Sequence, residues 1–233
     1  MASLRVAEIF ASIQGEGRWA GTPSAFVRVS GCNLRCVWCD TPYASWMPEG
    51  PAMTVAEIVS RVEGLGVRHV VLTGGEPLLF EPIIALAQAL KGAHVLTCET
   101  AGTVFRQLPC DLMSISPKLA NSTPGVEAGR GWPERHERTR ADLEPLRRLL
   151  DEYDYQLKFV VNPEGAHRDL FEIQELLARL GGVPSERVIL MAEGTDSETL
   201  TRRERLLAPV CIDQGFRLSP RLHVHWFGNT RGT

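Results

Sequence analysis

Residues 54–77 read TVAEIVSRVEGLGVRHVVLTGGEP, and this stretch combines one helix with the strand that follows it. Thr54 and Glu57 have the spacing of a capping box, and apolar side chains then recur at helical spacing as far as Leu65. His69–Thr73 is a short apolar run that two glycines stop. The order predicts a helix packed against a buried strand, which is the repeating unit of a parallel sheet.

The same alternation continues along the chain. Other strands are expected at 24–30, 94–97, 112–116, 156–161 and 187–191, and other helices at 82–90, 142–150, 170–180 and 200–207. About six strand–helix units fit this length, whereas a full eight-fold barrel usually needs ~250 residues. We therefore predict an α/β fold, an incomplete (β/α)6 barrel that forms one domain over residues 1–233. Its active site is expected at the C-terminal ends of the strands.

Three further local features are less regular. Thr195 and Glu198 have the spacing of a second capping box before the helix at 200–207. The segment from Asn121 to about Thr139 is rich in Gly, Pro and Arg and is long for a loop, so it is either a functional lid or a mobile segment. The last apolar run is Leu222–Phe227.

The composition excludes several classes of protein. The 233 residues are 44% hydrophobic and carry 25 basic and 28 acidic side chains, so the formal net charge is −3. Nucleic-acid-binding proteins usually have a basic excess, which this chain lacks. No stretch approaches the ~18–20 continuous apolar residues of a membrane span, and the N-terminus lacks the features of a secretory signal. We expect a cytoplasmic protein.

Three of the six cysteines, Cys32, Cys36 and Cys39, follow an expected strand with the spacing C-x3-C-x2-C. Three thiolates on one loop can hold three irons of a [4Fe-4S] cluster and leave the fourth iron without a protein ligand. A structural zinc ion is the alternative, but a closed zinc site needs four ligands and no fourth Cys or His lies at ligand spacing nearby. The remaining cysteines are expected to be buried thiols.

The cysteine spacing, with Trp38 just before the last cysteine, resembles the signature of the radical S-adenosylmethionine superfamily. Thr73-Gly74-Gly75-Glu76-Pro77 resembles a second superfamily feature in the expected place, directly after a strand. The resemblance implies a partial barrel in which S-adenosylmethionine chelates the open iron. Glycines at this position would let the backbone approach the cofactor closely, and Glu76 could accept a hydrogen bond from its ammonium group.

Further motifs resemble the 7-carboxy-7-deazaguanine synthase family, in register from about Val6 to the C-terminus. They are residues 9–17 (IFASIQGEG), Arg28, residues 39–41 (CDT), residues 99–103 (ETAGT) and residues 116–118 (SPK). The resemblance implies a magnesium-dependent homodimer that converts 6-carboxy-5,6,7,8-tetrahydropterin to 7-carboxy-7-deazaguanine with loss of ammonia. In this reaction an electron from an external flavodoxin or ferredoxin cleaves the cofactor, and the resulting 5′-deoxyadenosyl radical removes hydrogen from C6 of the pterin.

The resemblance also implies roles for single residues. The cluster would be held by Cys32, Cys36 and Cys39, and Mg²⁺ by the hydroxyl of Thr41. The cofactor would be bound by Trp38, Gly74, Gly75, Glu76, Glu99, Thr100, Ser116 and Lys118. The substrate would be bound by Gln14, Glu16, Arg28 and His225, with His223 as the competing histidine. Amide and carboxylate groups suit the edges of a pterin, and a guanidinium suits its carboxylate.

Two other functions remain open from the sequence. A glycyl-radical activase would share the cysteine motif but act on a protein, and it would not need the IQGEG segment. A zinc-stabilised binding module would have no catalytic activity. In the family, the terminal carboxylate near the histidine helps to bind the substrate, but Gly228–Thr233 extends further here, so we do not expect that role to carry over.

Overall fold

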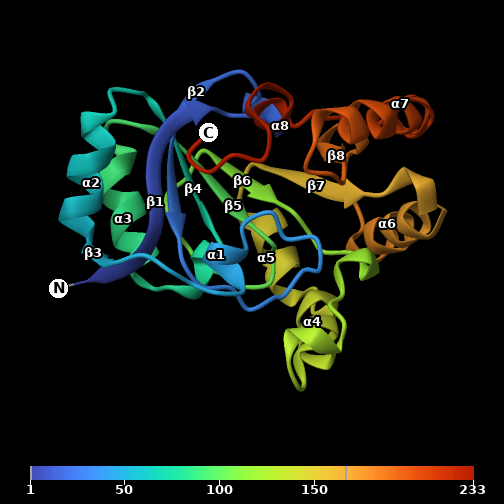
Figure 1. Ribbon diagram of the computed structural model, residues 1–233, viewed down its shortest axis with the longest axis horizontal. Helices are drawn as coiled ribbons and strands as arrows, with labels where there is room; N and C mark the ends of the chain where they lie inside the picture. The colour runs from blue at the N-terminus through green and yellow to red at the C-terminus, as the bar shows by residue number, and fades with distance from the viewer. Residues whose placement is uncertain (1, 166) are drawn as a thin grey trace.

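The computed structural model describes residues 2–165 and 167–233, and its centre is a nine-stranded sheet (Figure 1). The strand order is β3-β1-β2-β4-β5-β6-β7-β8-β9. Seven strands from β2 to β9 are parallel, as a series of strand–helix units requires. These are β2 (Pro23–Val29), β4 (His69–Gly74), β5 (Val95–Thr100), β6 (Leu112–Ile115), β7 (Tyr155–Val161), β8 (Val188–Ala192) and β9 (Arg217–Leu218). The predicted partial barrel is confirmed.

The N-terminal segment is itself part of the sheet, which the sequence analysis did not predict. Strand β1 (Ser3–Ile13) runs antiparallel to β2, and β3 (Ala52–Thr54) runs antiparallel to β1. Phe10 and Phe26 are opposite each other in this register and their rings stack with centroids 5.1 Å apart. Because the pairing is antiparallel, Val6 near the start of β1 lies beside Val29, at the end of β2 from which the cysteine motif begins.

Helices lie at both ends of the sheet in Figure 1. At one end α2 and α3 lie side by side, and α6 and α7 lie at the other end. The predicted capping box is confirmed, because the Thr54 side chain and the Glu57 side chain each bond the backbone N–H of the other residue. The second capping box is wrong: the N-cap of α7 is Asp196, whose carboxylate accepts from Thr199 N. The helices are α1 (Pro42–Ser45), α2 (Val55–Gly64), α3 (Pro82–Lys91), α4 (Trp132–Ala141), α5 (Glu144–Glu152), α6 (His167–Leu180), α7 (Ser197–Gln214) and α8 (Leu222–Phe227).

The expected long loop at 121–139 contains regular structure. Two 3-10 turns, η3 (Ala120–Ser122) and η4 (Val126–Ala128), lead into helix α4, which projects from the body of the molecule (Figure 1). The sequence pattern gave no sign of α4, since its only buried residue is His136 and it lacks an apolar stripe. Four more 3-10 turns are η1 (Gly17–Trp19), η2 (Pro77–Leu79), η5 (Pro163–Gly165) and η6 (Ser185–Arg187).

The core is one continuous set of aliphatic side chains between the sheet and its helices. Val27, Leu72, Leu157 and Leu190, from four parallel strands, are all completely buried, as is typical of a parallel sheet covered by helices. No helix among the described residues is both long enough and apolar enough to cross a membrane.

Candidate active site

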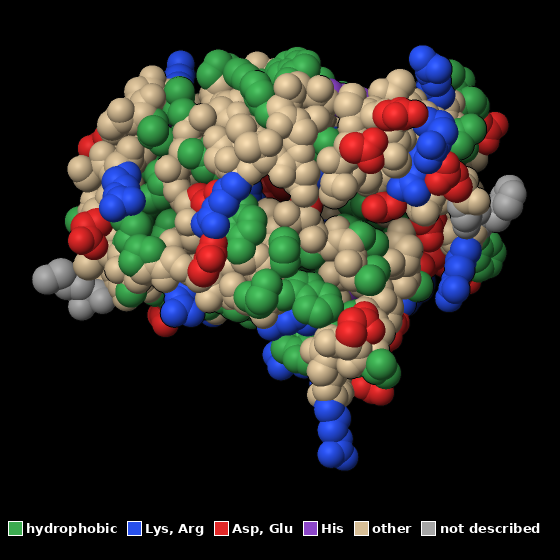
Figure 2. Space-filling model, viewed as in Figure 1, with side chains coloured by type: hydrophobic (Ala, Val, Ile, Leu, Met, Phe, Trp, Pro, Cys, Tyr) green, Lys and Arg blue, Asp and Glu red, His purple; other side chains and the backbone are tan. Residues whose placement is uncertain are grey.

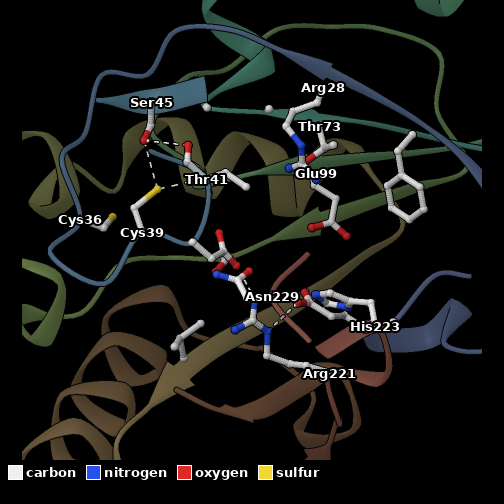
Figure 3. Close-up of a pocket in the computed structure, with 18 of the residues that line it drawn as sticks. Arg28, Cys36, Cys39, Thr41, Ser45, Thr73, Glu99, Arg221, His223 and Asn229 are labelled. Atoms are coloured by element: carbon white, nitrogen blue, oxygen red, sulfur yellow. Dashed lines mark hydrogen bonds and ion pairs between the residues drawn. The ribbon is translucent and has the colours of Figure 1, made fainter. Parts of the chain in front are cut away.

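A cavity of about 290 Å³ lies at the carboxyl ends of the parallel strands, as predicted for this fold. Side chains from the ends of β2, β4 and β5 line it, together with the loop that carries the three cysteines and the C-terminal residues 229–233. In Figure 2 the surface is hollowed near its centre, with acidic and basic side chains at the edge of the hollow. Figure 3 shows cysteines on one side of the cavity and charged groups across from them.

The cluster loop, residues 32–39, leaves the end of β2 and carries all three cysteines to the cavity. Leu34 N donates to Cys32 Sγ at 3.4 Å, and Ser45 Oγ lies 3.1 Å from Cys39 Sγ (Figure 3). Burial raises the pKa of Cys32 to about 12 and that of Cys36 to about 11. Without a metal these two groups are therefore protonated thiols, and metal binding would release their protons.

This donor set fits an iron–sulfur cluster better than a single ion. Within 2–165 and 167–233, no three His, Cys, Asp or Glu side chains lie close enough together to hold one metal ion. A closed zinc site brings four ligands to one point, whereas a cubane cluster spreads its ligands over separate corners. The three cysteines line one cavity, and the other three, Cys98, Cys110 and Cys211, are not among the described residues that line it.

Gly74 and Gly75 lie where β4 meets the start of the cluster loop. A Cβ on Gly74 would lie 2.1 Å from the carbonyl oxygen of Val29, and one on Gly75 would lie 2.3 Å from that of Gly31. Gly74 also has a φ of +147°, which favours glycine. The two glycines therefore allow the end of β4 to pass close to the backbone of Val29 and Gly31. The sequence predicts a different reason, the close approach of the cofactor. Both residues nevertheless line the cavity.

Glu76, which is predicted to contact the cofactor, is not among the described residues that line the cavity. Its side chain is completely buried and accepts hydrogen bonds from Leu78 N at 3.1 Å and Ala101 N at 2.8 Å. The Thr100 hydroxyl lies 2.8 Å from both carboxylate oxygens. Burial raises the pKa of Glu76 above its usual value. Glu76 therefore joins the end of β4 to the end of β5 from behind the cavity wall.

Trp38, Ser116 and Lys118 meet on the same side of the cavity as the cysteines. Lys118 Nζ donates to Ser116 O at 2.9 Å and lies 2.7 Å from Ser116 Oγ. The same ammonium lies 5.6 Å from the centre of the Trp38 ring. Among the described residues, Lys118 is the one lysine or arginine lining the cavity that forms no ion pair with a carboxylate. We call the three cysteines and these three residues the cysteine wall.

The opposite side is a network of paired charges centred on Lys158. This lysine comes from the middle of β7, is 1% exposed, and donates to Glu16 at 2.9 Å and to Glu99 at 2.8 Å. Burial alone would raise the pKa of Glu16, but the charges of Lys158 and Arg221 outweigh burial and hold this pKa well below its usual range. Because the pairs are buried, each charge depends on its partners.

Arg221 extends the network to the cluster loop. It donates to Glu16 at 3.1 Å and to the Gly194 carbonyl at 2.7 Å, and it also pairs with Asp40, which directly follows Cys39. Although burial would lower it, these two carboxylates raise the pKa of Arg221 above its usual value. We call Gln14, Glu16, Asp40, Glu99, Lys158 and Arg221 the charged wall.

Gln14 and Arg28, which are predicted to bind the substrate, both line the cavity. Gln14 Nε2 is 3.5 Å from Glu99, and its Oε1 accepts from Glu16 N at 3.2 Å. Arg28 uses Nε to bind Glu8 at 2.8 Å, and no other hydrogen bond of its guanidinium is found in the described part of the chain. Its two terminal nitrogens are therefore available to a ligand carboxylate. Thr41 also lines the cavity, 3.8 Å from Cys39 Sγ.

The two candidate histidines of α8 point to different sides of the helix. His225 faces α7, where its ring bonds Ser197 Oγ and Glu204 Oε1 at 3.0 Å each, and it does not line the cavity. His223 lines the cavity and packs so closely on Gly15 that a Cβ there would lie 2.1 Å from its Nδ1. The cause is the helix α8, because residues two positions apart in a helix point to different sides.

The sequence analysis missed Asp40, Lys158 and Arg221 as site residues. Lys158 had a usable signal, because one lysine interrupts the apolar run of a strand buried on both faces. For the C-terminal tail the sequence predicted only that a substrate-binding carboxylate does not carry over, but its residues 229–233 line the cavity. Arg231 in this tail binds Glu8 at 2.7 Å, and its guanidinium lies 4.2 Å from the centre of the Tyr43 ring.

Comparisons with known proteins show which sequences and structures resemble this chain. The sequence profile of the radical SAM superfamily matches residues 26–206. A 7-carboxy-7-deazaguanine synthase from Halobacterium salinarum is 46% identical over 95% of this chain and 90% of its own length. One from Rhodopirellula baltica is 43% identical over 99% and 89% of the two chains. The crystal structure of QueE from Escherichia coli is similar with a TM-score of 0.68 and 25% identity, covering 94% of this chain and 93% of its own.

Proposed function

Because this chain belongs to the 7-carboxy-7-deazaguanine synthase family of the radical SAM superfamily, we propose that it converts 6-carboxy-5,6,7,8-tetrahydropterin to 7-carboxy-7-deazaguanine with loss of ammonia. The product is a precursor in 7-deazapurine synthesis, the route that includes queuosine. The proposal rests on one observation, that the three cysteines and the charged wall line the same cavity. Such a cavity can hold a radical source and a polar heterocycle next to each other.

Cys32, Cys36 and Cys39 would hold the [4Fe-4S] cluster of the superfamily through their thiolates. When bound, the cluster and S-adenosylmethionine supply the radical chemistry, and the protein supplies orientation and a site shielded from water. The ammonium of Lys118 has no carboxylate partner among the described residues, so it is suited to the carboxylate of the cofactor. Ser116, Trp38, Gly74 and Gly75 line the cavity around it.

The substrate would lie against the charged wall. Arg28 presents its free terminal nitrogens to the pterin carboxylate, as a planar fork that can bind both oxygens. Gln14 and Glu16 offer amide and carboxylate groups to the amino and amide edges of the ring. His223 replaces His225 as the histidine proposed to contact the substrate.

Lys158 and Arg221 act on the substrate through Glu16. Each holds one carboxylate oxygen of this residue, Lys158 at Oε2 and Arg221 at Oε1. Both oxygens are thereby fixed in position and the carboxylate stays ionised, so it accepts hydrogen bonds and does not donate them. Glu99, held by the same lysine, is fixed in the same way. Its partners place Glu99 on the charged wall, so we propose it for the substrate side of the cavity in place of the cofactor.

Magnesium is a further part of the proposal. Thr41 lies on the cavity beside Asp40, and Mg²⁺ prefers oxygen ligands while keeping most of its waters. Substitution of Thr41 by Val is expected to raise the Mg²⁺ concentration needed for half-maximal activity, with unchanged iron content. Equal Mg²⁺ dependence in the variant and the parent protein would exclude Thr41 as a ligand. An external flavodoxin or ferredoxin as electron donor, and a homodimer, also remain proposals.

The function is tested by anaerobic turnover of the reconstituted protein. Dithionite, S-adenosylmethionine, Mg²⁺ and 6-carboxy-tetrahydropterin are added, and mass spectrometry follows the products. We expect 7-carboxy-7-deazaguanine, with one ammonia released for each product molecule. Cleavage of the cofactor without any change in the pterin would contradict the proposed substrate and would favour a radical enzyme that acts on another molecule, such as a glycyl-radical activase.

A further inference from the structure

Glu8 lies beside Arg28 in the antiparallel pair of β1 and β2. The two residues are opposite each other in the register, so their side chains lie on the same face of the sheet. Phe10 and Phe26 are the next pair on that face, and they line the cavity together with Arg28. Glu8 is not among the described residues that line the cavity, and its side chain is only 8% exposed. It is therefore a poorly exposed carboxylate that stands directly behind a cavity residue.

Both oxygens of the Glu8 carboxylate have partners. Oε2 accepts from Arg28 Nε and from the hydroxyl of Tyr43, both at 2.8 Å. Oε1 accepts from Arg231 Nε at 2.7 Å. Burial raises the pKa of Tyr43 to about 12, so its hydroxyl keeps its proton and remains a donor. Three donors from three separate segments therefore fix the position of one carboxylate.

This carboxylate fixes how Arg28 presents its guanidinium group. Glu8 holds the Nε of Arg28, and the ring centre of Phe10 lies 5.9 Å from its Cζ. A planar guanidinium held at Nε keeps its two terminal nitrogens for a second partner, as a fork of fixed direction. Because Arg28 lines the cavity, the fork is available to a ligand there. Without Glu8 the same fork would have to be ordered each time a ligand binds.

Arg231 attaches the C-terminal tail to this same carboxylate. We call residues 229–233, all of which line the cavity, the strap. In Figure 1 the strap turns back from α8 toward β1. Thr230 Oγ1 donates to the carbonyl of Phe227 in α8, and Thr233 Oγ1 donates to that of Thr230. These two bonds shape the strap but do not join it to the sheet.

Within the described residues, every hydrogen bond or ion pair that joins the strap to β1 or to the segment after α1 comes from Arg231. Its Nη2 donates to the Ala7 carbonyl at 3.2 Å, where the register of β1 and β2 shifts. Its Nη1 pairs with Glu49, and its guanidinium lies 4.2 Å from the centre of the Tyr43 ring. The side chain is 48% exposed. A segment held by one half-exposed side chain can detach without opening the core.

We propose that Glu8 is a positioning residue for the substrate: it orients Arg28 toward the substrate carboxylate, and through Arg231 it also latches the strap over the substrate side of the cavity. One carboxylate thereby couples the grip on the substrate to the closure of the site. Release of Arg231 opens the cavity for the substrate to enter or leave. The inference rests on the proposed function, since it requires Arg28 to bind a substrate carboxylate.

The first test is a double-mutant cycle on turnover of the pterin by the reconstituted protein. Glu8→Gln keeps the length of the side chain and removes its charge. It is expected to raise KM for the pterin about tenfold, with kcat nearly unchanged, because a poorly oriented Arg28 loses binding that the ground state and the transition state share. In a protein that already carries Arg28→Ala, the same change is expected to add less than about twofold, since Glu8 acts through Arg28.

The second test is stopped-flow binding of the pterin to the protein with S-adenosylmethionine but without dithionite, so that no turnover occurs. Arg231→Ala is expected to raise both the association and the dissociation rate constant, each by about fivefold, because the latch no longer holds the strap closed. Arg231→Lys keeps the charge but not the fork, so it is expected to recover part of the change.

The matched control is Arg202→Ala. Arg202 of α7 pairs with Glu164 at 2.9 Å and is 56% exposed, so it resembles Arg231 in its ion pair and exposure. It is not among the described residues that line the cavity. Its variant is expected to keep the rate constants and the KM of the parent protein.

A parent-like KM in Glu8→Gln would overturn the inference, and so would an equal rise of KM with and without Arg28→Ala. Unchanged rate constants in Arg231→Ala, or equal changes in Arg202→Ala, would overturn the latch. If Glu8→Gln does not fold, Arg231→Ala decides, because its loss leaves Glu8 paired with Arg28. A parent protein that does not bind the pterin would instead contradict the proposed function, so the two failures are distinct.

Discussion

The cysteine wall and the charged wall of the cavity are held in different ways. The cysteine wall comes from two short segments, residues 32–39 and 116–118, and its groups bond mainly to backbone and hydroxyl partners. The charged wall is assembled from residues 14–16, 40, 99, 158 and 221, and nearly every group in it pairs with an opposite charge. One wall leaves Lys118 without a carboxylate partner, whereas in the other wall the charged side chains are already paired within the protein.

Because of this difference, substitutions in the cysteine wall are expected to affect cofactor binding, and substitutions in the charged wall are expected to affect the stability of the fold as well. Loss of a group from the cysteine wall leaves few protein groups without partners, so the effect is expected in the cofactor. Loss of a group from the charged wall leaves buried charges uncompensated, so the effect is expected in folding as well. Matched substitutions, one in each wall, can therefore test whether the two walls differ in this way.

The largest effect is expected for Cys36→Ala. Two thiolates cannot hold the cluster as three do, so the reconstituted variant should lack iron, sulfide and activity, as measured by metal analysis and turnover. Cys211→Ala is the control, because Cys211 is a buried thiol of α7 that does not line the cavity. Full activity in Cys36→Ala would remove this residue from the site.

Lys158→Met is expected to lower the free energy of unfolding by about 3–5 kcal/mol, because Glu16 and Glu99 lose the buried ammonium that pairs with both. Urea titration at pH 7 measures the change. Lys118→Met is the matched variant on the cysteine wall, where the lost bonds go only to Ser116 and a cost below about 1.5 kcal/mol is expected. Equal losses in the two variants would show that the walls do not differ.

Ligand binding is expected to distinguish the cofactor side of the cavity from the substrate side. Lys118→Met should weaken S-adenosylmethionine and Arg28→Ala should weaken the pterin, each by about 1.5–3 kcal/mol, through loss of a charge-assisted bond. Calorimetry with each ligand, under anaerobic conditions, separates the two effects. A variant Arg28→Ala with unchanged pterin affinity would remove Arg28 from the substrate site.

The smallest effects distinguish the two histidines of α8. His225→Ala should cost about 0.5–1.5 kcal/mol of stability through the lost bonds to Ser197 and Glu204, with unchanged KM for the pterin. His223→Ala should raise that KM, since His223 faces the cavity. The reverse pattern would restore the assignment made from the sequence.

The sequence predicts the features that neighbouring residues encode, and it does not predict the pairings that the tertiary fold brings together. Strands such as His69–Thr73 and the cysteine motif could be predicted because each is encoded by residues close together in the sequence, where apolar runs, glycines and ligand spacing can be read directly. The pairing of Lys158 with Glu16 depends on strands brought together by the fold, and neither residue carries a sign of the other. Helix α4 was missed because contacts with the cluster loop stabilise it, including the stacking of Arg35 on Trp132 at 4.0 Å.

The central claim is that three thiolates leave one iron of a cluster open to the cofactor. Electron paramagnetic resonance of the reduced, reconstituted protein before and after addition of S-adenosylmethionine tests it most directly. A reduced [4Fe-4S] signal that changes when the cofactor binds is the predicted result. A signal that stays the same at saturating cofactor, or zinc in place of iron and sulfide, would contradict the account.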